Sequence, residues 1–205
     1  GAIVNHHDVE AAVWVVDDGL QIEARIVRDS TGNLALIGVV LNQGPQTLKN
    51  PRISVVFYRD DVIFNEESAT GALGIDLGQG DWTPFRVTLP DDPWDSWRVS
   101  VEQGTFTFYR AYPGLDIASE ELTAAGTLRS VVRNTAEIPL TNLWGVAAAF
   151  DESEDLVAVG WAFPETETLQ PGEATLLQIP PRNWTGDIAR AEEWFVQVRG
   201  TALDD

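Results

Sequence analysis

Few side chains in this sequence combine the types and spacing that catalysis or metal binding requires. The only histidines, His6 and His7, precede Asp8, and a His-His-Asp run contains metal-binding groups. Adjacent side chains of an extended chain point to opposite faces, so the two imidazoles are poorly placed to share one ion. No other histidine and no cysteine is present, so a Ser-His-Asp triad, thiol catalysis and cysteine-ligated metals have no support. We predict no catalytic residue, no cofactor and no dedicated metal site.

An acidic segment, residues 151–155, is the second place where spacing suggests chemistry. Asp151, Ser153 and Asp155 put oxygen ligands at alternate positions, as calcium loops do. An EF-hand loop also needs glycine at its sixth position and an acid at its twelfth, where this chain has Leu156 and Ala162. We interpret the segment as a solvated hairpin turn. A weak calcium site at its three oxygen-bearing residues is the alternative.

Tryptophan is the most distinctive residue type, with eight copies. Exposed indole rings can stack on sugar rings. The candidates for such a ligand site lie beside turns, glycine or proline: Trp82, Trp94, Trp144 and Trp184. The other four lie in alternating segments and are expected in the protein core: Trp14, Trp97, Trp161 and Trp194. For all eight we favour packing in a core or at a domain junction, with sugar binding as the alternative.

Composition excludes several classes of partner. The 13 lysines and arginines stand against 32 aspartates and glutamates, a formal net charge of −19. This charge repels nucleic-acid backbones and anionic lipid headgroups. The longest apolar run, residues 35–41, is far shorter than the roughly 20 residues of a membrane helix. The chain begins with glycine and contains no methionine, which fits either trimming of a start methionine before Gly1 or removal of a signal peptide.

Apolar and polar residues alternate along most of the chain, with the period of half-buried strands. Residues 20–26, 85–89, 97–101, 157–163 and 177–179 follow this pattern, and turn residues separate them. Turns every 8–12 residues or so are typical of an all-β sandwich or barrel. Short helices are expected only at residues 116–125 and 187–193, the second with Asp187 as its N-cap.

The two halves of the chain resemble each other at an offset of 92 residues. Six residues are identical at this offset without a gap: Leu36, Val39, Val40, Asn42, Leu48 and Asn50 match Leu128, Val131, Val132, Asn134, Leu140 and Asn142. Each half has a size that suits an immunoglobulin-like sandwich of about 100 residues. We therefore predict two tandem antiparallel β-sandwich domains, residues 1–103 and 104–205, joined by a short and stiff junction.

Both halves also share a strand ending in asparagine, a strand ending in an aromatic and an acid, and a Leu-x-x-Gly-acid turn. The segments are Gly38–Asn42, Val55–Asp60 and Leu77–Asp81, and then Ser130–Asn134, Ala147–Asp151 and Leu169–Glu173. This order resembles the FxLYD-type domain, an immunoglobulin-like module of secreted and lipid-anchored bacterial proteins. The resemblance implies an extracytoplasmic setting and no enzymatic activity.

These observations predict a non-enzymatic module of the bacterial cell envelope, a spacer or binding unit that meets a protein partner through edge strands or an inter-domain groove. A carbohydrate-binding protein that uses turn-borne Trp and Asp is the first alternative. An acid-catalysed hydrolase is the second, and it requires a cleft with two facing carboxylates.

Overall fold

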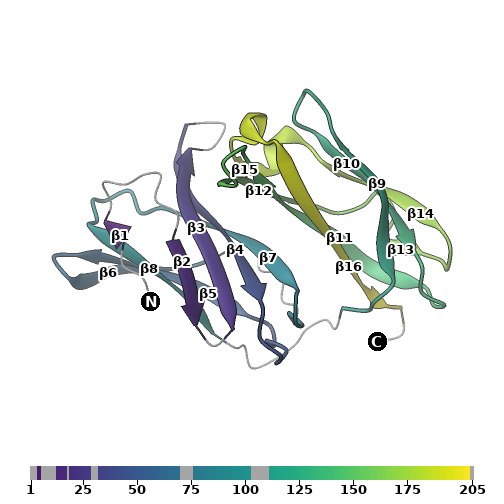
Figure 1. Ribbon diagram of the computed structural model, residues 1–205, viewed down its shortest axis with the longest axis horizontal. Helices are drawn as coiled ribbons and strands as arrows, with labels where there is room; N and C mark the ends of the chain where they lie inside the picture. The colour runs from purple at the N-terminus through teal and green to yellow at the C-terminus, as the bar shows by residue number, and fades with distance from the viewer. Residues whose placement is uncertain are drawn as a thin grey trace.

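The computed structural model of the protein describes residues 4–5, 13–17, 19–28, 32–69, 76–102 and 111–203, with side chains from residue 19 onward. The described residues form sixteen strands and two short 3-10 helices (Figure 1). The prediction of an all-β fold with very little helix is confirmed. Among the described residues, no helix has the length and apolar content needed to span a membrane.

The first half of the chain forms two antiparallel sheets packed face to face (Figure 1). One sheet has the order β2-β3-β4-β7 and the other β1-β8-β5-β6. The strands are β1 (Val4–Asn5), β2 (Val13–Asp17), β3 (Leu20–Arg28), β4 (Leu34–Asn42), β5 (Arg52–Arg59), β6 (Val62–Ser68), β7 (Trp82–Thr88) and β8 (Ser96–Glu102). The chain changes sheet between β4 and β5, β6 and β7, and β7 and β8, as immunoglobulin-like sandwiches do.

The second half repeats this arrangement. One sheet has the order β14-β10-β9. In the other sheet, β12 and β13 pair with successive parts of one edge of β11, β15 pairs with β12, and β16 pairs with the opposite edge of β11. The elements are β9 (Leu115–Leu122), β10 (Leu128–Asn134), β11 (Leu140–Phe150), β12 (Leu156–Ala162), β13 (Thr168–Leu169), β14 (Ala174–Ile179), η1 (Pro181–Asn183), β15 (Trp184–Gly186), η2 (Ile188–Arg190) and β16 (Glu193–Ala202). Strands β9, β10 and β14 take the places of β3, β4 and β7, and strands β11, β12 and β16 those of β5, β6 and β8.

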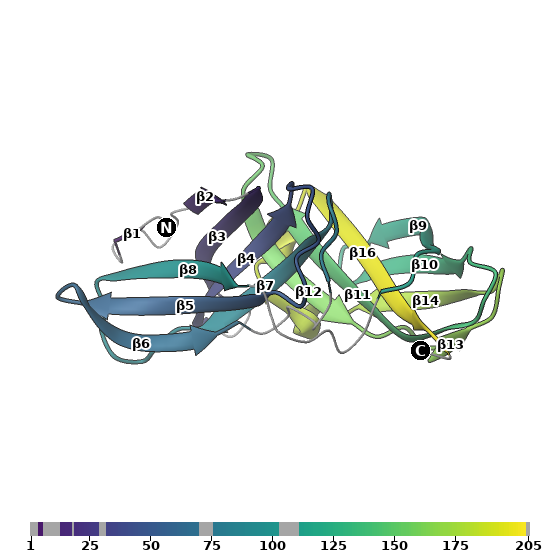
Figure 2. The same cartoon turned by 90° about the horizontal axis from the view of Figure 1, so that it is seen from below.

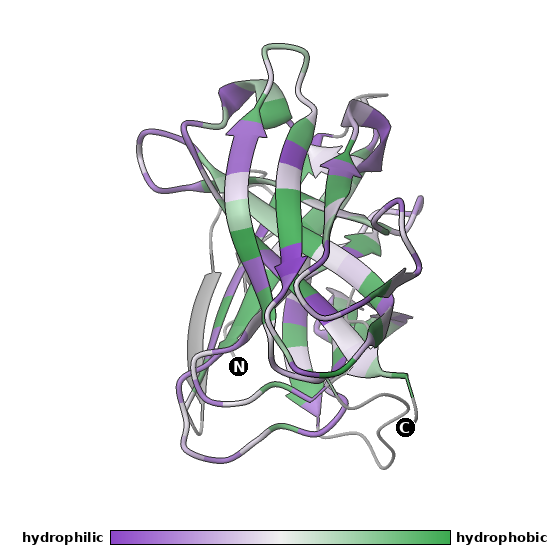
Figure 3. Ribbon diagram, turned by 90° about the vertical axis from the view of Figure 1, so that its right-hand side faces the viewer, coloured by the Kyte–Doolittle hydropathy of each residue, from purple (hydrophilic) through white to green (hydrophobic). Residues whose placement is uncertain are grey.

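Each sandwich has its own apolar core between its two sheets. The first core includes Leu36, Phe57, Phe85 and Trp97, all almost fully buried. The second is built around Leu128, Val132, Leu177 and Ile179. Figure 3 views the second unit from its outer side and shows hydrophilic and hydrophobic bands alternating along its strands. This alternation places one face of each outer sheet in the core and the other in solvent.

The repeat seen in the sequence is matched by equivalent side-chain hydrogen bonds at one buried turn in each unit. The Nδ2 of Asn42 donates to the carbonyls of Gln46 and Leu77, each at 2.8 Å. The Nδ2 of Asn134 donates to the carbonyls of Ile138 and Leu169, each at 2.9 Å. Because 134 − 42 = 92, these asparagines stand at the offset that relates the two halves. The asparagines of the shared motif therefore stabilise the turns at the ends of β4 and β10 by the same pair of hydrogen bonds.

The two sandwiches pack sheet against sheet, so the protein has four β layers (Figures 1 and 2). The outer face of β3, β4 and β7 lies against the outer face of β11 and β12, with β15 beside them. Both middle layers are consequently covered on two sides. This explains why β4 and β12 are buried along most of their length and not at alternate residues only.

Two expectations about helices have different outcomes. The helix predicted at residues 116–125 is wrong, because β9 (Leu115–Leu122) forms there and pairs with β10. Pairing with a neighbouring strand outweighs the helix propensity of its Ala, Glu and Leu residues. Near residue 187, η2 has Asp187 as its N-cap, whose Oδ1 accepts from the Ala189 backbone N–H at 3.2 Å. This helix ends at Arg190, and β16 begins at Glu193.

Of the expected stiff junction, residues 103–110 lie outside the described residues.

Candidate functional site

The acidic segment forms the turn between β11 and β12, and its carboxylates bind protein groups. The Asp151 Oδ1 accepts from the backbone N–H groups of Ser153 at 3.0 Å and Asp155 at 3.2 Å. The Asp151 Oδ2 lies 2.6 Å from Nη2 of Arg190, and the Asp155 Oδ1 lies 3.0 Å from Nη2 of Arg25. Arginine thus occupies the position of a cation at two of the three candidate calcium ligands, Asp151 and Asp155. Within the described ranges, no group of three or more His, Cys, Asp or Glu side chains is placed to hold a metal ion.

These contacts also fix the charge of Asp151. Burial acts to raise the pKa of its carboxyl. The two backbone hydrogen bonds and the Arg190 guanidinium outweigh burial, so the pKa of Asp151 lies below its ordinary value. The residue therefore stays ionised and keeps the β11–β12 turn paired with η2.

Three of the four tryptophans named as candidates for a sugar platform are buried, which contradicts that alternative and favours packing. The exposed fractions of Trp94, Trp144 and Trp184 are 6%, 7% and 5%. The Trp94 ring lies 5.2 Å from that of Phe57 in the first core, and the Trp184 Nε1–H donates to the Ile179 carbonyl at 3.3 Å. Trp94 and Trp184 therefore belong to the two cores, and Trp144 packs against Trp82 where the two units meet.

The other tryptophans with described side chains are also buried or partly buried. Trp97 is buried in the first core, and Trp194 is partly buried against the second. Trp82 and Trp161 are partly buried where the two units meet, together with Trp144. The side chain of Trp14, as well as His6 and His7, lies outside the described residues.

The junction between the two units is an apolar contact between sheets. Ile37 of β4 is fully buried against Ala148 of β11 and Leu156 and Val159 of β12. Trp82 packs both on this cluster and on Trp144. Side chains of this kind are typical of a permanent interface and not of two units that separate readily.

A buried polar contact crosses the same interface. Glu23, 5% exposed, accepts a hydrogen bond at Oε1 from the Leu156 backbone N–H at 3.1 Å. Burial raises the pKa of Glu23, although the Leu156 hydrogen bond and the charge of Arg25 act in the opposite direction. Arg25 is itself buried and pairs with Asp155 across the junction. Three side chains and one backbone amide thus fix how β3 and β12 are aligned.

A second set of polar contacts lies at the other end of the junction. Arg199 of β16 lies 3.4 Å from Asp81, and its Nη1 donates to the Asp76 carbonyl, also at 3.4 Å. Arg86 of β7 lies over the Trp161 ring, 4.8 Å from its centroid, and donates to Thr185 at 3.3 Å. The two units are therefore tied together along the whole length of the contact.

Comparing the repeats shows that these surfaces are specialised. At an offset of 92, buried Ile37 corresponds to Arg129, half of whose side chain is exposed on the outer sheet of the second unit. Buried Trp144 corresponds in the same way to exposed Arg52 on the outer sheet of the first unit. At these two positions the face that meets the other unit has a large apolar side chain, and its solvent-facing copy has arginine. The sequence contained this signal, and reading the repeat for its differences would have located the interface.

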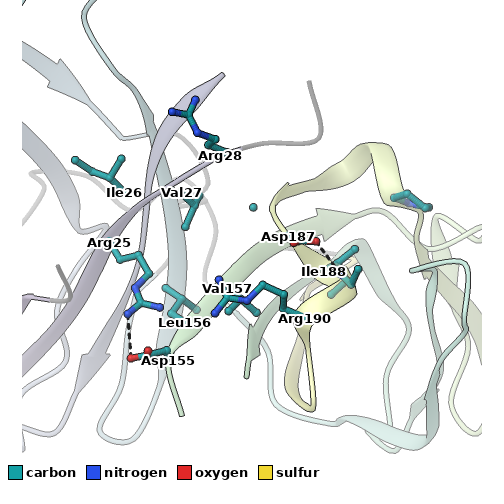
Figure 4. A pocket seen from close by; sticks show the side chains of 13 residues that line it. Arg25, Ile26, Val27, Arg28, Asp155, Leu156, Val157, Asp187, Ile188 and Arg190 are labelled. Carbon is teal, nitrogen blue, oxygen red and sulfur yellow. Dashed lines mark hydrogen bonds and ion pairs between the residues drawn. The ribbon is translucent and has the colours of Figure 1, made fainter. Parts of the chain in front are cut away.

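At one end of the junction the two units enclose a cleft of about 640 Å³ (Figure 4). Arg25 and Arg28 of β3 line the cleft on one side, with the Arg28 side chain directed away from it, and Arg190 of η2 lines the other side. Arg28 is exposed and donates to the Gly32 carbonyl at 3.1 Å, while Arg25 and Arg190 are paired with aspartates. The cleft gathers positive groups in a strongly acidic chain, and its shape depends on how the units are held.

An acid-catalysed hydrolase needs two facing carboxylates, one of which has a raised pKa. Burial raises the pKa of Glu120, which lines a shallow depression with Glu121 on the outer side of the second unit. Neighbouring side chains on a strand leave opposite faces, and Glu121 pairs with Arg129 at 3.3 Å. These two carboxylates therefore do not face each other across a substrate position.

No protein-family model matches the chain, and no curated protein is significantly similar to it in sequence.

Proposed function

We propose that the chain is a non-enzymatic binding and spacer module of the bacterial cell envelope. Two immunoglobulin-like units, each resembling the FxLYD-type domain, present a protein partner with a surface of fixed shape. The resemblance supports an extracytoplasmic position, and the net charge of −19 fits a surface that avoids nucleic acids and anionic lipids.

The observation that carries this proposal is the buried junction between the units. Domains in one chain move against each other by default unless a large apolar interface holds them. Here Ile37, Ala148 and Leu156 are at most 1% exposed, and Glu23 and Arg25 add polar contacts that require one alignment. A spacer needs a constant length, and a partner-binding surface that spans two units needs a constant angle.

A protein partner fits the described surfaces better than a sugar. Carbohydrate stacking needs exposed rings, whereas Trp94, Trp144 and Trp184 are almost completely covered. The cleft between the units has half-exposed Arg190 beside apolar Val27 and Ile188, and exposed Arg28 lies at its rim. Arginine next to apolar side chains is the composition that protein interfaces favour.

Site-specific photo-crosslinking in the cell envelope tests the function. A photoreactive phenylalanine at position 28, on the rim of the cleft, is expected to crosslink to one discrete protein. The same group at Glu121, an exposed position on the outer sheet, serves as the control. Combining the position-28 label with Ile37→Arg, which should open the junction, is expected to remove the crosslinked product.

The proposal fails if position 28 gives no product in the envelope, or if its product is unchanged by Ile37→Arg. It also fails if the protein fractionates with the cytoplasm in its native cells.

A further inference from the structure

One row of alternate side chains along β12 begins in the buried junction between the units and ends in solvent. Val159 is fully buried by the first unit, Trp161 is partly buried, and Phe163, just beyond the end of the strand, is 75% exposed. Alternate residues of a strand share a face, so these three continue the surface that the first unit covers. A single exposed phenylalanine is common on protein surfaces, so its surroundings decide whether it belongs to a binding site.

Phe163 stands at the edge of a pocket and not on a flat surface. The pocket has a volume of about 630 Å³ and includes Trp144, Pro164, Glu165 and Glu167 in its lining. Trp144 is 7% exposed and belongs to the same interface face of β11. No lysine, arginine or histidine is among the described residues that line the pocket. An aromatic and proline wall beside two exposed carboxylates suits a partner that is both apolar and positively charged.

Two aromatic rings of this protein, one of them in the same row, are covered by arginine guanidinium groups. Trp161, two residues before Phe163, is covered by the guanidinium of Arg86 from the first unit, 4.8 Å from the ring centroid. Arg59 lies over the Phe64 ring in the same manner, at 3.9 Å. Guanidinium planes stack on aromatic faces and pair with carboxylates, so one arginine side chain can use both Phe163 and the nearby glutamates.

We propose that this pocket binds an arginine-bearing segment of the partner protein, with the guanidinium on Phe163 and between Glu165 and Glu167. This inference rests on the proposed function, because it names the chemistry of the protein that the module holds. It is separate from the cleft around Arg28, which lies at the opposite end of β12. The net charge of −19 favours the approach of a cationic segment at low ionic strength.

Two labelled peptides test the proposal by fluorescence anisotropy. One alternates arginine, leucine and glycine, and the other has citrulline in place of every arginine, which keeps the shape and removes the charge. The arginine peptide should bind at least roughly tenfold more tightly to the wild-type chain, because charge and ring stacking act together. Backbone amide resonances of residues 142–144, 163 and 165–167 should shift on titration with this peptide.

Substitutions in the pocket should weaken binding of the arginine peptide. Phe163→Ala is expected to weaken it by about tenfold, as loss of an aromatic interface residue often does. Glu165→Gln with Glu167→Gln should weaken it by roughly threefold to tenfold at low salt, and by less at high salt. Glu152→Gln with Glu154→Gln removes two exposed glutamates at the same spacing, and Phe195→Ala removes another exposed ring. Both controls should bind within about twofold of the wild type.

Equal affinity for the arginine and citrulline peptides, or equal losses in the pocket and control variants, would overturn the proposal. Displacement of the peptide by a neutral oligosaccharide at similar concentration would assign the pocket to a sugar and overturn it as well. Failure of both peptides to bind would overturn this inference alone, because the crosslink at position 28 reports on the other end of the junction.

Discussion

Glu23 shows how a single carboxyl couples the junction to pH. Burial raises its pKa, so the folded protein binds a proton at this site more tightly than the unfolded chain does. Its contribution to stability is full below the ordinary carboxyl pKa and declines as pH rises through the raised value. Asp151 acts with the opposite sign: its lowered pKa gives stability above the ordinary range that is lost as pH falls.

Glu23→Gln should therefore change the pH dependence of stability. Glutamine keeps an oxygen that can accept from the Leu156 N–H and carries no charge to bury. We expect the free energy of unfolding to decline less with rising pH, from the ordinary carboxyl pKa up to the raised value, than in the wild type. Urea unfolding at a series of pH values measures this slope. Exposed Glu152→Gln is the control, and a slope that Glu23→Gln leaves unchanged would show that Glu23 does not titrate in that window.

At the scale of elements, alternation predicted where strands form, but not how many of their faces are buried. Alternation located β7 and β8 because one side of each faces the core and the other faces solvent or the junction. It did not show that two sheets would be covered twice, since contact between units is set by residues about a hundred positions apart. It failed at residues 116–125, where β9 forms through pairing with β10. The tryptophans beside turns were misplaced as a possible platform because a turn position does not reveal which way a ring folds.

The buried asparagines test the repeated motif at the same scale. Asn42→Ala removes two donated hydrogen bonds and leaves the carbonyls of Gln46 and Leu77 without that donor, and Asn134→Ala does the same to Ile138 and Leu169. Each change should cost about 2–3 kcal/mol, the range for unsatisfied buried polar groups. Thermal and denaturant unfolding measure both variants, with exposed Gln43→Ala as a control expected within about 0.5 kcal/mol of the wild type. Losses below that limit in both asparagine variants would mean that the motif only marks a turn.

At the scale of the whole molecule, the two sandwiches act as one body because an apolar face of each is covered by the other. The solvent-facing copies of that face carry Arg129 and Arg52 where the junction has Ile37 and Trp144. Equivalent sheet faces of the two repeats therefore differ: at these positions one is apolar and forms the junction, and its counterpart is charged and faces solvent. The junction also determines the cleft near Arg28 and the exposed end of the row at Phe163. Binding at either place depends on this one contact.

The most direct test is the rotational correlation time of each unit, obtained from backbone ¹⁵N relaxation. In the wild type, residues of both units should report one correlation time, that of the whole chain. Ile37→Arg places at the junction the side chain that the second unit exposes at position 129. It should give shorter and unequal times for the two units, while exposed Val62→Arg should leave them unchanged. Separate correlation times in the wild type would contradict the account.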